Sequence, residues 1–158
     1  CGGEVPAAET KDALDEELIS MAVSVADKVS ERVDEFQFNL GLEHIWALIA
    51  RANKYIDEKE PWVLAKDESR KAELDTVMRN LAEVLRIVSI LILPFMHTTS
   101  ERMRTQLGLS DKEAVWEDAY EFYQMEGCSV EKGEILFPRL DIDKELEELG
   151  KIGAENAV

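Results

Sequence analysis

Apolar side chains recur at every third or fourth position through most of the chain, which is the period of a helix with one buried face. Over residues 10–36 they form a single stripe, made of Leu14, Leu18, Met21, Val25, Val29 and Val33. Similar stripes predict helices over residues 37–57, 69–93 and 98–107. Because each helix has one apolar face, we expect an all-α, up-and-down bundle around a shared core.

Capping and helix-breaking residues mark the ends of these helices. Thr10 is the expected N-cap of the first helix. Pro61 lacks an amide hydrogen and disfavours helix in the residue before it, so the second helix should end near Glu60. Pro94 should end or kink the third helix, and Gly108 stands where a helix commonly stops.

Beyond the fourth helix the pattern is less regular. A turn or two of helix is expected around Trp116, and residues 127–141 contain glycine and proline and are typical of an extended segment or loop. Residues 143–149 predict a short final helix. We therefore expect a bundle of four to five helices over residues 1–110, with an irregular extension over residues 111–158 that packs on it.

The net charge of −16 argues against binding to nucleic acid, because phosphates repel an acidic protein. Its distribution changes that picture. Residues 44–104 contain ten basic and nine acidic side chains, so the excess acid lies in the two flanks. The central part therefore permits contact with RNA without predicting it, because acidic faces that only keep a protein soluble would give the same distribution.

Little in the sequence suggests catalysis or metal binding. Cys1 and Cys128 form no CxxC pair, and His44 and His97 fall on different predicted elements, so we expect no metal site and no catalytic residue. Few cysteines are typical of a reducing, cytoplasmic setting. The apolar run at residues 87–95 is too short for a bilayer, which needs about 20 residues, so no membrane partner is expected.

The corner between the second and third predicted helices carries the chemistry of interest. Trp62 follows Pro61 at a helix end, where an indole can stack on an unpaired base. Alternatively, Trp62 folds back and plugs the end of the bundle. Spacing alone leaves both interpretations open and favours the plug.

The run NKYIDEKEPWVLAKDE at residues 53–68 resembles the segment that joins two helices in the anticodon-binding bundle of bacterial-type methionyl-tRNA synthetases, a class I family. The resemblance continues through NLAEVLRIVSILILPFMHTTSERMRTQLGL at residues 80–109, Trp116, and KGEILFPRLD at residues 132–141. It covers about residues 36–146, so its motifs are far more specific than a single short match.

This resemblance implies that Trp62 stacks on a base of the CAU anticodon in the loop of the methionine tRNA. Asn53, Lys54, Lys59 and Lys66 are the further candidates for contact, the lysines with phosphates. The segment around Phe137 and Pro138 would lead back toward the catalytic domain of the full enzyme, with these two as packing residues.

The resemblance also implies an enzyme that uses ATP to attach methionine to its tRNA, with ATP and zinc bound in the catalytic domain. Neither the HIGH-like nor the KMSKS-like sequence of class I synthetases occurs here, so we expect an inactive fragment without a cofactor of its own. It would begin after the helix that carries the family's other anticodon-binding residues. Its partners would be the tRNA and its own catalytic domain, and not DNA. The rival hypothesis is a structural or protein-docking bundle without RNA contact.

Overall fold

The computed structural model describes residues 3–8, 10–143, 145–146, 149 and 151. Its main elements are the helices α1 (Ala13–Asp34), α2 (Phe38–Lys59), α3 (Pro61–Leu64), α4 (Lys71–Leu91) and α5 (His97–Gln106), with short 3-10 turns η1 (Glu68–Arg70) and η2 (Trp116–Tyr120).

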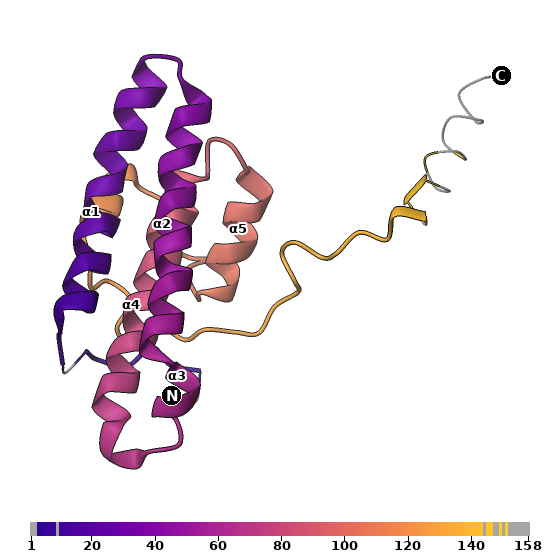
Figure 1. Cartoon of the computed structure of the whole chain (residues 1–158). Coiled ribbons are helices and arrows are strands. Elements are labelled where there is room, and N and C mark those ends of the chain that lie inside the picture. The colour runs from indigo at the N-terminus through magenta and orange to yellow at the C-terminus, as the bar shows by residue number, and fades with distance from the viewer. Residues whose placement is uncertain (1–2, 9, 144, 147–148, 150, 152–158) are drawn as a thin grey trace.

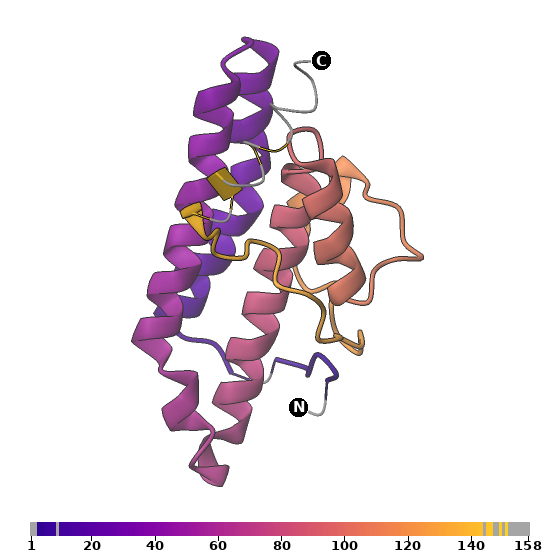
Figure 2. The ribbon, with the colours of Figure 1, turned by 90° about the vertical axis from the view of Figure 1, so that its right-hand side faces the viewer.

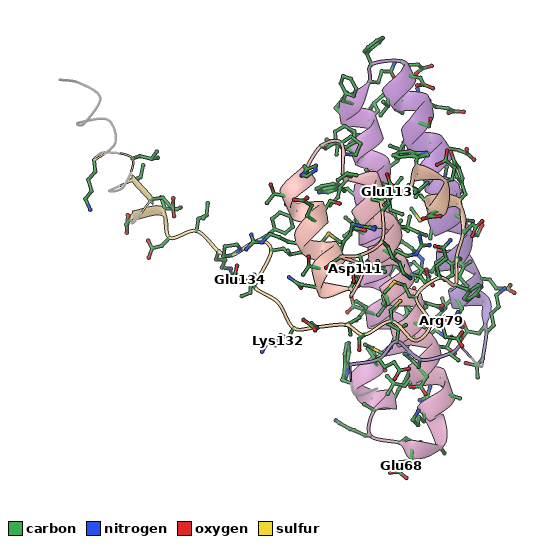
Figure 3. All side chains as sticks on the ribbon, turned by 180° about the vertical axis from the view of Figure 1, so that it is seen from behind. Glu68, Arg79, Asp111, Glu113, Lys132 and Glu134 are labelled. Atoms are coloured by element: carbon green, nitrogen blue, oxygen red, sulfur yellow. The ribbon has the colours of Figure 1, made fainter. Side chains whose placement is uncertain are left out.

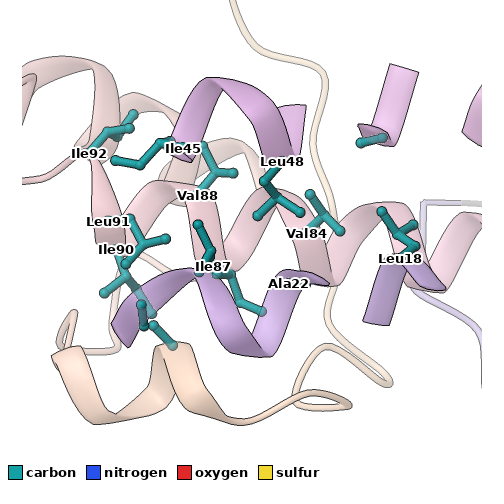
Figure 4. Close-up of a cluster of buried hydrophobic side chains, with 14 of the residues drawn as sticks. Leu18, Ala22, Ile45, Leu48, Val84, Ile87, Val88, Ile90, Leu91 and Ile92 are labelled. Carbon is teal, nitrogen blue, oxygen red and sulfur yellow. The ribbon is translucent and has the colours of Figure 1, made fainter. Parts of the chain in front are cut away.

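The long helices form one bundle. α1 and α2 pair side by side, α4 packs along both of them, and α5 packs on α4 (Figures 1 and 2). The predicted stripes meet in the middle, where the fully buried side chains include Leu18, Ile45, Leu48, Ile87 and Leu91 (Figure 4). Each such side chain contributes about 1.5–3 kcal/mol when it leaves water. The all-α bundle is confirmed.

The start of α1 differs from the prediction. Asp12, not Thr10, is the N-cap: its Oδ1 accepts hydrogen bonds from the amides of Leu14 at 2.9 Å and Asp15 at 3.2 Å. In return, the Asp15 carboxylate accepts one from the amide of Asp12 at 2.8 Å. This reciprocal pair satisfies more free amides than Thr10 could, and Thr10 instead binds Thr76 of α4.

A buried ion pair attaches the extension to α4. Glu83 and Arg86 lie one turn apart, with Arg86 Nε 2.9 Å from Glu83 Oε2. Arg86 also donates to the carbonyl oxygens of Asp118 and Glu121, and Glu83 accepts from the amide of Met125 at 2.6 Å. The predicted helical turn at Trp116 is confirmed as η2, and these contacts hold it against the bundle.

The N-terminal segment and the extension share a second, smaller core. Val5 exchanges backbone hydrogen bonds with Gly127 and Cys128. The side chain of Val5 packs in a cluster with four other buried residues, which are Ala82, Leu107, Leu109 and Met125. Residues from both ends of the chain therefore cover one flank of α4 and α5.

Packing of the extension stops near Leu136. Phe137 is 65% exposed and Ile142 is 72% exposed, and Pro138 is exposed as well. The side chains of Arg102 and Gln106 donate hydrogen bonds to Glu134, and beyond this point the segment leaves the bundle (Figures 1 and 3). Phe137 and Pro138 are therefore not packing residues within the described chain. The helix predicted over residues 143–149 includes residues 144, 147 and 148, which lie outside the described part. No described helix has the length and apolar character needed to cross a membrane.

Gly108 ends α5 as predicted, with a φ of +69°, and a Cβ there would lie 2.1 Å from the carbonyl oxygen of Ser129. Gly108→Ala should therefore cost more than the roughly 1–2 kcal/mol of left-handed backbone strain alone. Gly127→Ala is the matched control, because Gly127 has a φ of +72° and an added Cβ would meet only the Glu4 side chain, at an ordinary contact distance of 4.0 Å. Urea unfolding of both variants measures the difference, and equal losses would contradict a close approach of the extension to α5.

Candidate nucleic-acid interface

The corner after α2 is built around a left-handed residue. Glu60 has φ 46° and ψ 59°, and it serves both as the C-cap of α2 and as the N-cap of α3. Its amide donates to the carbonyl of Ile56 at 2.9 Å, and its own carbonyl accepts from the amide of Val63 at 2.7 Å. Pro61 occupies the first position of α3, where a missing amide hydrogen costs nothing. The predicted end of the second helix at Glu60 is confirmed.

Trp62 lies on the outside of this corner. Its side chain is 51% exposed, whereas Leu64 is 1% exposed and belongs to the main core. Leu64 therefore fills the end of the bundle, and the alternative in which Trp62 is the plug is wrong. Glu68 marks the tip of the molecule just beyond α3 (Figure 3). The indole of Trp62 thus lies near one end of the bundle and faces solvent.

The other predicted contact residues divide into two groups. Asn53, Lys54 and Lys66 are exposed, and Lys54 forms an ion pair with Glu58 one turn away at 3.4 Å. Lys59 is 6% exposed, and its Nζ lies 2.7 Å from Asp12 Oδ2 and 3.2 Å from Asp15 Oδ1. Its prediction as a phosphate contact is therefore corrected: its charge is directed into the bundle and already neutralised.

Lys59 belongs to a buried polar network that sequence reasoning missed. Tyr55 donates its hydroxyl to Asp15 at 2.5 Å, and Asn80 of α4 donates to Asp15 at 3.3 Å and to the Tyr55 oxygen at 3.2 Å. The helical period contained a signal for it. Lys59 continues the inner face of α2 after Tyr55, and Asp15 stands one turn before Leu18 on the inner face of α1.

The network shifts the pKa of Tyr55, Lys59 and Asp12. Burial, together with the hydrogen bond to Asp15, raises the pKa of Tyr55. Burial disfavours the charged form of Lys59, but its hydrogen bonds to Asp12 and Asp15 outweigh this and raise its pKa. Burial acts upward on the pKa of Asp12 too, but the hydrogen bond from Lys59 and backbone amides leave that pKa lowered. All three groups therefore keep their usual charge at neutral pH.

The chain matches the family model described as the anticodon binding domain of methionyl tRNA ligase over residues 5–153. It belongs to this family. It is 48% identical to the methionine–tRNA ligase of Caldanaerobacter subterraneus over 94% of this chain, and 46% identical to that of Clostridium acetobutylicum over 97%. These matches cover only 23% and 24% of the two relatives. The chain thus spans about a quarter of their length.

Solved structures of the family share the fold. The apo form of methionyl-tRNA synthetase from Mycobacterium tuberculosis superposes with a TM-score of 0.82 at 28% sequence identity, covering 88% of this chain and 28% of that one. The helix bundle and its corner after α2 therefore belong to the anticodon-binding domain of this family. In the described part of this domain, no group of three or more His, Cys, Asp or Glu side chains could hold a metal ion.

Asp12→Asn should lower the free energy of unfolding at neutral pH while keeping an oxygen at the N-cap. The loss should stay below about 1 kcal/mol, because the Asp12 side chain is 55% exposed. Since the pKa of Asp12 is lowered in the folded state, the wild-type advantage is complete above about pH 4 and is lost as the pH falls through the lowered value. Urea unfolding across that range measures it.

The matched background for this prediction is Lys59→Met, which removes the partner ammonium. In the Lys59→Met protein, Asp12→Asn should lower the free energy of unfolding by less than in the wild type, and the loss should depend less on pH. An Asp12→Asn difference that stays constant with pH, or one unchanged by removal of Lys59, would contradict the assignment of the shift to this ion pair.

Proposed function

We propose that this domain recognises the CAU anticodon of methionine tRNA by stacking Trp62 on an unpaired base of the loop. The observation that carries the proposal is the half-exposed indole on a corner whose backbone is fixed on both sides. Pro61, the residue before Trp62, has a restricted φ, and the buried side chain of Leu64 anchors the backbone after Trp62 in the core. An indole held in this way loses little freedom on binding, so most of the stacking energy is retained.

Polar and charged side chains around the corner have supporting roles in this proposal. Lys66 lies two residues after the end of α3 and is exposed, so it can meet a phosphate of the loop. Asn53 and Lys54 lie about two helical turns before the corner on α2, where Asn53 offers both a donor and an acceptor to a base edge. The acidic flanks of the chain repel phosphates elsewhere, which favours approach of the tRNA at the near-neutral central part.

The domain works, in this proposal, as the recognition part of a cytoplasmic ligase that attaches methionine to its tRNA. The catalytic domain would supply ATP binding, zinc binding and bond formation, and this domain would supply positioning. The segment after Leu136 would lead to that catalytic domain, since its large apolar side chains Phe137, Leu140 and Ile142 are exposed in the described chain. This role needs no catalytic residue within the domain.

Trp62→Ala in the full-length ligase should weaken binding of a CAU anticodon stem-loop by about 5- to 150-fold, because stacking contributes roughly 1–3 kcal/mol per base. Binding of a stem-loop with a scrambled anticodon should change little. Fluorescence titration of labelled stem-loops measures both affinities.

Trp46→Ala is the control for this substitution. Trp46 is 50% exposed, nearly as much as Trp62, but lies in the middle of α2. It should leave the affinity for CAU unchanged. Equal binding of CAU and scrambled loops by the wild type, or unchanged binding by Trp62→Ala, would favour a docking bundle without RNA contact.

Lys66→Ala should make binding of the CAU stem-loop less sensitive to salt. Each phosphate contact with a single strand releases counterions and contributes about −0.7 to the slope of log K against log salt concentration. Loss of Lys66 should reduce the slope by about that amount, whereas loss of Lys28, exposed on α1, should not. Titrations over a range of salt concentrations measure the slopes, and equal slopes for the two variants would exclude Lys66 from the interface.

A further inference from the structure

One carboxylate joins the three long helices at the end of the bundle that carries Trp62. Asp15 of α1 is 2% exposed and accepts hydrogen bonds from Tyr55 and Lys59 of α2 and from Asn80 of α4. Tyr55 and Asn80 donate to Oδ1 of this carboxylate, whereas Lys59 and the amide of Asp12 donate to Oδ2. These hydrogen bonds therefore fix the relative positions of the start of α1, the last turns of α2 and the middle of α4.

Stability alone does not explain this arrangement. Moving an ammonium and a carboxylate out of water is costly, and apolar side chains of similar volume are often as stabilising in the same place. Apolar contacts, however, tolerate small sliding and rotation of helices, whereas hydrogen bonds with short distances and fixed directions do not. The network thus restricts the register of the helices more tightly than the surrounding core.

The restricted register is transmitted to Trp62 through three residues of rigid backbone. Lys59 is the last residue of α2, Glu60 is held in the left-handed region by backbone hydrogen bonds of its amide and its carbonyl, and Pro61 has a restricted φ. No flexible linker separates the buried ammonium from the indole. A rotation or shift of the last turn of α2 would therefore move the indole with it.

We propose that Asp15 and Lys59 are positioning residues for anticodon recognition: their buried ion pair sets the orientation in which Trp62 is presented to the RNA. The inference rests on the proposed function, in that Trp62 is taken as the stacking residue. It assigns to Lys59 a role different from phosphate contact, since its ammonium lies inside the bundle and acts through α2.

The test uses the full-length ligase labelled with 5-fluorotryptophan and observed by fluorine NMR. This chain contains three tryptophans, Trp46, Trp62 and Trp116, whose resonances are assigned by single substitutions with Phe. Lys59→Met should shift or broaden the Trp62 resonance and leave that of Trp46 in place. Lys59→Arg, which keeps a cation at the position, should restore part of the wild-type spectrum.

Binding provides the second readout. Lys59→Met should weaken binding of the CAU stem-loop at least about 5-fold, the lower end of the loss expected when a stacked base is lost. Lys59→Arg should recover part of this affinity. Val29→Ala is the control for general destabilisation, because Val29 is fully buried in the main core and does not belong to the network. It should lower stability without changing the Trp62 resonance or the affinity.

Tyr55→Phe keeps the test valid if Lys59→Met does not fold. This change removes a single hydroxyl, and with it the 2.5 Å hydrogen bond to Asp15, without leaving a large cavity. The Trp62 resonance should shift in the same direction as in Lys59→Met, by a smaller amount. An unmoved Trp62 resonance in every network variant that folds would overturn the inference.

The two proposals fail in different ways. If Trp62→Ala weakens CAU binding but Lys59→Met does not, the positioning role is wrong and the stacking role stands. If Trp62→Ala binds normally, the stacking role is wrong, and with it the role of Asp15 and Lys59 in recognition. A Lys59→Met variant that loses affinity only as much as Val29→Ala at equal stability would also overturn the positioning role.

Discussion

The buried carboxylate of Asp15 is the constraint on which the end of the bundle that carries Trp62 depends. It completes the cap of α1, neutralises Lys59 and orders the hydroxyl of Tyr55. Elsewhere α1, α2 and α4 meet mainly through apolar side chains, which favour contact without fixing direction. At this end of the bundle, the buried charges of Asp15 and Lys59 lie immediately before the corner that carries Trp62.

A second buried ion pair has a comparable role on another side of α4. Glu83 and Arg86 bind three backbone groups of the extension, so a segment with little regular structure is held in one place. Asn80 of α4 donates to Asp15 and Tyr55 in the network before the corner, and Glu83 and Arg86 of α4 bind the backbone of the extension. Helix α4 thus acts as the common support for the corner and for the extension.

For the proposed recognition of tRNA, the charge pattern and the fold together would limit how RNA approaches the domain. The chain as a whole is strongly acidic, and only its central part is near neutral. That part includes α3 and the exposed indole, while much of α1 and the extension contribute the acid. In the proposed function, repulsion along the sides combined with the exposed indole at one end would suit a hairpin loop better than a long duplex.

The sequence by itself determined the bundle, the break at Glu60 and the helix stop at Gly108, because apolar period, proline and glycine act through local geometry. It did not determine whether Trp62 or Leu64 fills the end of the bundle. Both residues lie at a corner between helices, where the helical spacing of apolar residues does not show which side chain is buried. It also placed Lys59 among the lysines that could contact phosphate. Only the tertiary structure decided these points. Whether a side chain is buried, and what it binds, depends on which distant residues the fold brings beside it, as Asp15 and Asn80 are brought beside Lys59 and Tyr55.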